Sequence, residues 1–183
     1  MIEPGPGILL IADPFLKDPN FLRTVVFLCE HNEEGSFGFV INRPYDSTLD
    51  ELIPDMEGYS LPVYYGGPVQ MNTIHFLHQC PEEIPGGVEV MKGLYWGGDF
   101  EKAMELVRSG NAETSKIRFF IGYSGWGESQ LQEELKEKSW LTVNATRKLV
   151  FPDKIEDIWK DALKHLGGDY EMMIHFPIDP QLN

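Results

Sequence analysis

The apolar residues of this chain are gathered into short runs that glycine or proline repeatedly interrupts. One run covers residues 8–12 and is bounded by Gly7 and by the pair Asp13-Pro14, and a second covers residues 24–29. Short apolar runs between turn residues are typical of buried strands, and these fall far below the roughly 20 residues that a membrane-spanning helix needs. The sequence therefore predicts a folded core built on strands, without a membrane segment.

Similar runs recur along the chain and predict a mixed α+β architecture. Strands are expected over residues 7–12, 24–31, 37–42, 62–65, 73–78, 86–91, 117–123 and 140–145. The second and third should form a hairpin, because only a short turn containing Gly35 separates them. Since strands gather early in the chain and helices are interspersed later, one domain with a mixed sheet is favoured over a doubly wound parallel sheet.

Amphipathic helices are expected among these strands. They cover a short stretch from Ser47 or Thr48 to Pro54 and residues 100–109, 128–138 and 153–166. Asp99 is a suitable N-cap for the second helix, and Asp153 with Glu156 has the spacing of a capping pair for the last. The whole chain, residues 1–183, is expected to form a single domain in which residues from about 168 to 183 are a C-terminal tail.

The chain carries a large negative charge. It has 29 acidic residues against 15 basic ones, which gives a formal net charge of -14, and such a field repels phosphates and anionic lipid heads. Direct nucleic-acid binding is therefore not expected, and a local basic patch is the open alternative. The cations that could form such a patch are Lys17, Arg23, Arg43, Arg118, Arg147 and Lys148.

Cysteine content and the N-terminus favour a cytoplasmic protein. The two cysteines, Cys29 and Cys80, are too few for the disulfide framework of a small secreted domain. No basic region precedes an apolar stretch at the N-terminus, so no secretory signal peptide is expected.

The segment from Gly122 to Gly127 (Gly-Tyr-Ser-Gly-Trp-Gly) is the one most suggestive of chemistry. It follows a predicted strand and precedes a predicted helix, where a nucleophile elbow of pattern G-x-S-x-G would place Ser124, but Trp126 stands at the second glycine position. The segment also lacks the lysine of a P-loop and the spacing of a dinucleotide fingerprint. We interpret it as a tight turn in which Trp126 fills a crevice, with a nucleophile and an anion cradle as the alternatives.

Histidine spacing does not indicate a metal site. His75 and His78 are three residues apart on a predicted strand, which places them on opposite faces, and Glu30-His31 has no H-E-x-x-H partner. We predict neither a metal nor a cofactor.

Three further segments combine polar or aromatic residues with turn residues. Asn42-Arg43 ends a strand and could face an anionic ligand, because arginine suits bidentate contacts, or could pair with one of the many acidic side chains. Tyr65-Gly66-Gly67-Pro68 and residues 95–99 both place aromatic side chains before a Gly-Gly pair. Such segments permit close backbone approach and can wall a pocket, and they are also ordinary sheet corners.

Several of these segments together resemble the AlgH/YqgE family of bacterial proteins. The matching stretches are residues 7–12, 21–26, 30–31, 35–44, 65–69, 93–99 and 122–127, followed by Gln130-Leu131 and Glu133-Glu134-Leu135. The resemblance implies an α+β fold with a strongly curved, barrel-like mixed sheet and peripheral helices, in a cytoplasmic bacterial protein. It also implies a link to regulation of exopolysaccharide production and the family's frequent description as a transcriptional regulator, but no reaction. One departure is Ser124, where alanine is common in the family, and this argues against a nucleophile.

The leading functional hypothesis is a non-catalytic regulatory module that binds a small molecule or a protein partner. Its site would form where the segments at 42–43, 65–67, 95–99 and 122–126 converge. The candidate residues are Glu30, His31, Asn42, Arg43, Tyr65, Gly66, Gly67, Tyr95, Trp96, Gly98, Asp99, Gly122, Tyr123, Ser124, Gly125 and Trp126. The alternative is a hydrolase or phosphoryl-handling enzyme, in which Glu30, His31, Arg43 and Asp99 would meet in one concave site.

Overall fold

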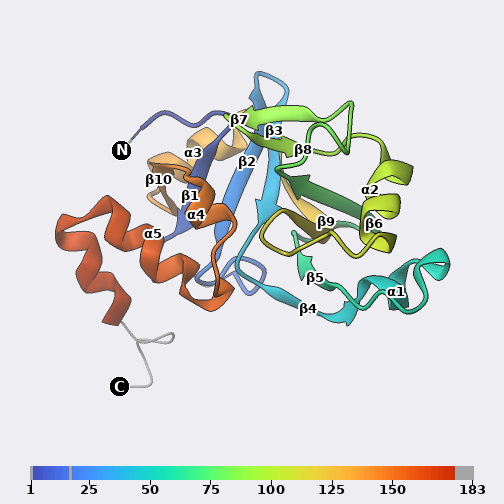
Figure 1. Ribbon diagram of the computed structural model, residues 1–183. Helices are drawn as coiled ribbons and strands as arrows, with labels where there is room; N and C mark the ends of the chain where they lie inside the picture. The colour runs from blue at the N-terminus through green and yellow to red at the C-terminus, as the bar shows by residue number, and fades with distance from the viewer. Residues whose placement is uncertain (1, 17, 176–183) are drawn as a thin grey trace.

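The computed structural model describes residues 2–16 and 18–175, which form a single α+β domain around one mixed sheet (Figure 1). The strands are β1 (Ile8–Ala12), β2 (Val25–Asn32), β3 (Gly35–Val40), β4 (Pro44–Thr48), β5 (Pro62–Tyr65), β6 (Val69–His78), β7 (Val88–Met91), β8 (Leu94–Trp96), β9 (Ile117–Trp126) and β10 (Trp140–Asn144). Their order is β10-β1-β2-β3-β9-β6-β8-β7, with β4 paired to β5 and β5 to β9. The predicted α+β class is confirmed. The strand order ends at β10 and β7, so the sheet does not close into a barrel.

Strand β9 organises the sheet. Residues 119–121 of β9 pair with β5 in parallel and with β6 in antiparallel orientation, so that these two strands flank it. Farther along, residues 124–126 pair with β3. The Gly-rich segment is therefore part of a strand that runs to Trp126, and the predicted tight turn is wrong.

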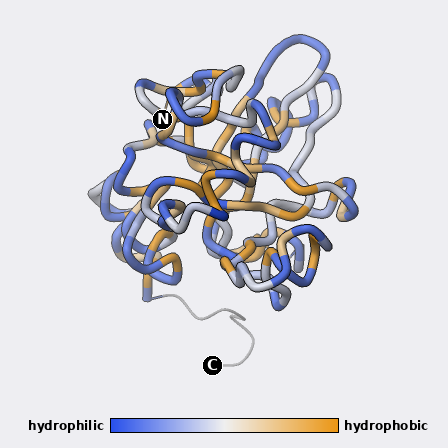
Figure 2. The backbone as a smooth tube through the Cα atoms, turned by 45° about the vertical axis from the view of Figure 1, so that its right-hand side comes forward, coloured by the Kyte–Doolittle hydropathy of each residue, from blue (hydrophilic) through white to orange (hydrophobic). Residues whose placement is uncertain are grey.

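The helices pack against the sheet. They are α1 (Leu49–Leu52), α2 (Phe100–Arg108), α3 (Gln130–Lys136), α4 (Arg147–Val150) and α5 (Ile158–Leu166), with the 3-10 segments η1 (Pro54–Met56), η2 (Ile155–Asp157) and η3 (Gly168–His175). Ala103, Met104 and Val107 of α2 belong to one buried cluster, and Trp159 and Leu163 of α5 belong to another. In Figure 2, hydrophobic residues run through the central strands, and hydrophilic residues occupy many of the surrounding loops.

Local capping explains where two helices begin. Thr48 and Glu51 form the capping box of α1, and the Asp99 carboxylate accepts a hydrogen bond from the Lys102 amide at 3.1 Å at the start of α2. Both predictions are confirmed, as is the β2–β3 hairpin. The predicted pairing of Asp153 with Glu156 is wrong, because the last helix enters through η2 without a side-chain cap.

The remaining differences concern short elements. Strands β4 and β8 and helix α4 are too short to show the periodicity by which longer elements are recognised. Within the predicted tail, residues 168–175 form η3, where Tyr170, Met173 and Ile174 pack against the core. Residues 176–183 lie outside the described part.

Candidate functional site

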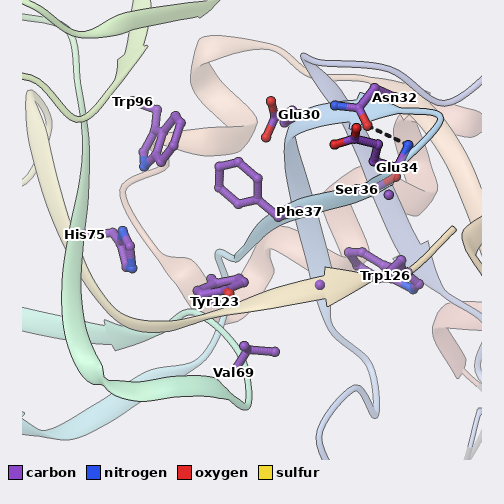
Figure 3. Close-up of a pocket in the computed structure, with 13 residues that line it drawn as sticks. Glu30, Asn32, Glu34, Ser36, Phe37, Val69, His75, Trp96, Tyr123 and Trp126 are labelled. Carbon is purple, nitrogen blue, oxygen red and sulfur yellow. Dashed lines mark hydrogen bonds between the residues drawn. The ribbon is translucent and has the colours of Figure 1, made fainter.

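A pocket of about 580 Å³ opens on the sheet where β3, β6, β8 and β9 come together (Figure 3). Its lining residues are Glu30, Asn32, Glu34, Gly35, Ser36, Phe37, Val69, His75, Trp96, Tyr123, Gly125, Trp126 and Gly127. Of the sixteen candidate residues, it therefore gathers Glu30, Trp96, Tyr123, Gly125 and Trp126.

A row of three paired residues crosses the sheet beneath the pocket. Glu30 of β2 pairs with Phe37 of β3, and Phe37 in turn pairs with Gly125 of β9. Directly opposed residues in antiparallel strands project to the same face. In this row the Glu30 carboxylate lies on one side of the Phe37 ring, and Gly125 leaves the other side of the ring without a neighbouring side chain.

A β-bulge in β2 aims Glu30 at this face. The register of β2 and β3 shifts between Leu28 and Glu30, so Cys29 is an extra residue in β2. Cys29 lies in the same buried cluster as Phe27, and regular alternation would send Glu30 to the other face. The bulge instead lets Glu30 oppose Phe37 at the pocket, as bulges beside functional sites often redirect a side chain.

A kink at Gly122 places Tyr123 in the pocket. Phe120 belongs to the buried cluster against which Tyr123 packs, although residues three apart on a regular strand face opposite sides. Gly122 between them has a φ of 69°, in the left-handed region that favours glycine. A Cβ at Gly122 would lie 2.4 Å from the Gly67 carbonyl oxygen, so this position requires glycine on two grounds.

Aromatic rings form one continuous wall of the pocket. The ring centroid of Phe37 lies 4.6 Å from that of Trp96 and 5.9 Å from that of Tyr123, and both pairs meet edge to face. His75 continues the wall, with its centroid 5.8 Å from that of Tyr123. The His75 Nε2 atom lies 3.0 Å from the Thr73 hydroxyl, and partial burial lowers the pKa of the His75 imidazole, which favours a neutral ring at pH 7.

The polar rim is acidic. Glu30 and Glu34 are exposed carboxylates that Figure 3 shows above Phe37, on the side away from Val69. The Glu34 amide donates to the Asn32 side-chain oxygen at 2.8 Å, which fixes the hairpin turn. No lysine or arginine is among the described residues that line this pocket.

Asn42, Arg43 and Tyr65 do not reach this pocket. Asn42 accepts a hydrogen bond from the Val25 amide and donates to the Arg23 carbonyl, each at 2.9 Å. Arg43 donates to the carbonyls of Pro19, Asn20 and Leu22, and its guanidinium lies 5.7 Å from the Tyr65 ring. Arg43 and Tyr65 line a smaller hollow with Asn20, and Arg43 pairs with backbone carbonyls instead of an acidic side chain.

Gly66 and Gly67 serve backbone packing. A Cβ at Gly66 would lie 2.4 Å from the Gly122 carbonyl oxygen, and one at Gly67 would lie 2.2 Å from the Tyr123 carbonyl carbon. The two glycines let the β5–β6 connection lie directly on β9. Ser124 is fully buried, and its hydroxyl donates to the Gly66 carbonyl at 3.0 Å. The hydroxyl is therefore not accessible to a substrate as a nucleophile would have to be.

The segment at residues 95–99 contacts His78 and provides the N-cap of α2. Tyr95 donates to Glu89 at 2.6 Å and stacks on His78. His78 is fully buried, and its Nδ1 accepts from the Cys80 amide at 3.1 Å, so its Nε2–H must donate to the Gly97 carbonyl at 2.8 Å. Gly98 lines a small neighbouring hollow that shares His75 and Trp96 with the main pocket, and Asp99 is occupied as the N-cap of α2.

His31 and Trp126 have other neighbours. His31 contacts the Ser36 hydroxyl through Nδ1 and lines a separate hollow. Trp126 is 5% exposed and donates from Nε1 to Glu134, which also accepts from the Trp140 indole. The prediction that Trp126 fills a crevice is confirmed. Among the described residues, no group of three or more potential ligands could hold a metal ion.

Of the cations considered for a basic patch, the four arginines make contacts within the fold, whereas Lys148 is exposed. Arg118 is 5% exposed and donates to the carbonyls of Thr114 and Pro152. Arg147 donates to the Lys92 carbonyl, and Arg23 stacks over Trp159 with its guanidinium 4.6 Å from the ring centroid. Lys17 lies outside the described residues.

Sequence comparison decides the family. The model of the family described as AlgH-like (DUF179) matches residues 9–171. The chain belongs to the AlgH-like family. A UPF0301 protein of Chlorobium limicola is 43% identical over 178 residues, which cover 97% of this chain and 95% of that protein. UPF0301 protein CT0663 of Chlorobaculum tepidum is 44% identical with the same coverage.

Solved structures of similar proteins share the AlgH-like fold. The solution structure of the AlgH protein from Pseudomonas aeruginosa is 29% identical, with a TM-score of 0.75, and the match covers 96% of this chain and 97% of that one. Protein DIP2367 from Corynebacterium diphtheriae, at 22% identity and a TM-score of 0.76 over 94% of this chain and 92% of that one, shows the same fold. Within the described residues, no helix has both the length and the apolar character needed to cross a bilayer.

Sequence reasoning missed several pocket residues of this AlgH-like chain. They are Asn32, Glu34, Gly35, Ser36, Phe37, Val69, His75 and Gly127. Phe37 and Glu34 carried a usable signal, because they lie in the hairpin that joins Glu30 to the rest of the pocket. Val69 carried none, since only the pairing of Val69 with Tyr123 brings it to the site.

Proposed function

We propose that this AlgH-like protein is a non-catalytic, cytoplasmic binding module whose site is the pocket over Phe37 and Gly125. The observation that carries the proposal is the way aromatic side chains from three strands surround an open space. At about 580 Å³ the pocket has the size of small-molecule sites, which are typically 300–1,000 Å³ and rich in aromatic residues.

The distribution of polar groups favours binding over catalysis. A hydrolase or phosphoryl-handling site would need Glu30, His31, Arg43 and Asp99 in one cavity. Glu30, His31 and Arg43 instead line three separate hollows, and Asp99 caps a helix. Ser124, the remaining nucleophile candidate, is buried and hydrogen-bonded.

The regulatory and cytoplasmic parts of the proposal have separate support. Members of the AlgH-like family are often described as transcriptional regulators, and a ligand-occupied module could act through a protein partner without touching DNA. Cys29 and Cys80 are both free thiols, which suits a reducing compartment.

Filling the pocket tests the proposal. A Cβ at Gly125 would meet only ordinary contacts, 3.5 Å from the Tyr123 ring and 3.8 Å from Val69, so Gly125→Leu should fold normally while its side chain fills the space beside Phe37. We expect small-molecule fragments screened by two-dimensional NMR to shift the amide signals of Tyr123, Gly125 and Gly127 in the wild type. The same fragments should leave Gly125→Leu unchanged.

The matched control is Gly5→Leu, because a Cβ at Gly5 would have no neighbouring atom within 4 Å and Gly5 lies outside the pocket lining. This variant should bind as the wild type does. A screen without pocket hits, or hits that persist in Gly125→Leu, would count against the pocket as a binding site.

A further inference from the structure

The lining of the pocket combines exposed carboxylates with half-buried aromatic side chains. Glu30 and Glu34 supply two carboxylates at the rim, and Phe37, Trp96 and Tyr123 supply the rings. No described lining residue is a lysine or arginine that could neutralise the two carboxylates. The field in the pocket therefore favours a positively charged guest.

His75, the histidine in the pocket lining, does not offset the negative charge of Glu30 and Glu34. The His75 Nε2 atom lies 3.0 Å from the Thr73 hydroxyl, and the ring packs between Phe39 and Tyr123. Partial burial lowers the pKa of the His75 imidazole, and none of its described contacts is with a carboxylate. The neutral imidazole thus extends the aromatic wall.

The kind of cation follows from the rings. Aromatic faces attract weakly hydrated organic cations, and groups of such rings are a recurrent site for quaternary ammonium ions. A metal ion would instead need several oxygen or nitrogen ligands close together, and no such group occurs in the described residues. The pocket of about 580 Å³ also leaves room for a molecule much larger than a hydrated ion.

We propose that the pocket binds a small organic cation, with a quaternary or alkylated ammonium group placed between the carboxylates of Glu30 and Glu34 and the rings of Phe37, Trp96 and Tyr123. This inference rests on the proposed function and adds the chemical class of the ligand. Glu30 and Glu34 select the charge, and the rings select a cation with low hydration.

A pair of probes with the same shape and different charge tests the inference. Choline carries a trimethylammonium group where 3,3-dimethylbutan-1-ol carries a neutral tert-butyl group. At constant ionic strength, we expect choline to bind about 10-fold more tightly than the alcohol, in keeping with a cation–π contact supported by carboxylates. The indole N–H signal of Trp96 and the amide shifts of Tyr123 and Gly125, followed by two-dimensional NMR, report binding at the pocket.

Charge variants separate the carboxylates at the rim from the overall charge of the protein. Glu30→Gln with Glu34→Gln should weaken choline binding by about 5-fold or more, as loss of two partly solvated charge contacts predicts, and should leave the alcohol unaffected. The control, Glu57→Gln with Glu101→Gln, removes two exposed carboxylates outside the pocket lining and should retain choline binding.

The outcomes distinguish this inference from the proposed function. Equal binding of choline and the alcohol, with both lost in Gly125→Leu, would overturn the charge selection and leave the pocket as a site for neutral ligands. No choline binding up to 100-fold above a typical weak-ligand Kd of about 1 mM would also overturn it. A fragment screen without pocket hits would refute the proposed function itself.

Discussion

Gly125 of β9 lies directly opposite Phe37 of β3, and the missing side chain at Gly125 opens the space that the pocket occupies. Glycine weakens a strand interior because it has high conformational entropy when unfolded and no side chain to pack. No φ in the left-handed region holds Gly125 in place. The fold therefore carries a glycine that its backbone does not need.

The first prediction is that Gly125→Val stabilises the protein. The new side chain would make ordinary contacts with Tyr123 and Val69, and valine favours strands, so the free energy of unfolding should rise by about 0.5–1 kcal/mol. Urea denaturation measures the change. Gly38→Val is the contrasting variant, because a Cβ there would lie 2.2 Å from the Phe27 carbonyl oxygen, and it should lose stability. A destabilised Gly125→Val would show that the glycine is required by the fold.

A second prediction separates the two constraints on Gly122. Gly122 and Gly97 both have a φ of 69°, but a Cβ at Gly97 would meet no atom within 4 Å. Gly97→Ala should therefore lower the free energy of unfolding only by the strain of a left-handed backbone at alanine, about 1–2 kcal/mol. Gly122→Ala adds a collision with the Gly67 carbonyl and should cost clearly more. Equal losses of unfolding free energy in the two variants would mean that β9 relaxes around the new methyl group.

The third prediction concerns Arg118, a buried arginine whose hydrogen-bond acceptors are backbone carbonyls. Its guanidinium donates to the carbonyls of Thr114 and Pro152 and lies 5.3 Å and 5.4 Å from the rings of Tyr64 and Phe151. Arg118→Ala leaves both carbonyls without this donor and should cost about 3 kcal/mol. Arg118→Lys should recover only part of the loss, because an ammonium group cannot reproduce the planar fork.

Arg108→Ala serves as the control for Arg118, because it removes an exposed arginine from α2. It should change the midpoint of chemical unfolding little. If Arg118→Ala behaved in the same way, the guanidinium would contribute no net stability despite its burial.

A fourth prediction is a loss of stability in mild acid that originates at His78. Burial lowers the pKa of the His78 imidazole, with smaller opposing effects from the Gly97 hydrogen bond and from Glu83. A histidine with a lowered folded pKa binds fewer protons than in the unfolded chain. Its stabilising contribution is therefore complete above the unfolded pKa of about 6.5 and is lost as the pH falls below it.

Two measurements check the assignment to His78. The NMR signal of its ring carbon should remain that of a neutral imidazole below pH 6.5, and the free energy of unfolding should decline over the same range. His78→Gln, which keeps a donor for the Gly97 carbonyl, should reduce that decline, and the remainder is expected from His75, whose pKa burial also lowers. Titration of His78 near pH 6.5 would contradict the neutral tautomer inferred from its hydrogen bonds.

Much of the fold was predictable because its signals are local. The apolar runs at residues 8–12 and 117–123 predict strands, and Asp99 and Thr48 predict where two helices begin. The pocket was only partly predictable, because two interruptions of strand alternation build it. Neither the bulge at Cys29 nor the kink at Gly122 can be located without knowing which strands pair. Arg43 illustrates the same limit, since its partners are the backbone carbonyls of a distant loop.

The most direct test is to locate bound choline by intermolecular nuclear Overhauser effects. With choline in excess, its trimethylammonium protons should show contacts to the Trp96 indole and to the rings of Phe37 and Tyr123, and these contacts should be absent in Gly125→Leu. Contacts confined to rings outside the pocket, such as Phe21, or the same contacts in Gly125→Leu, would contradict the claim that an organic cation occupies the space over Phe37 and Gly125.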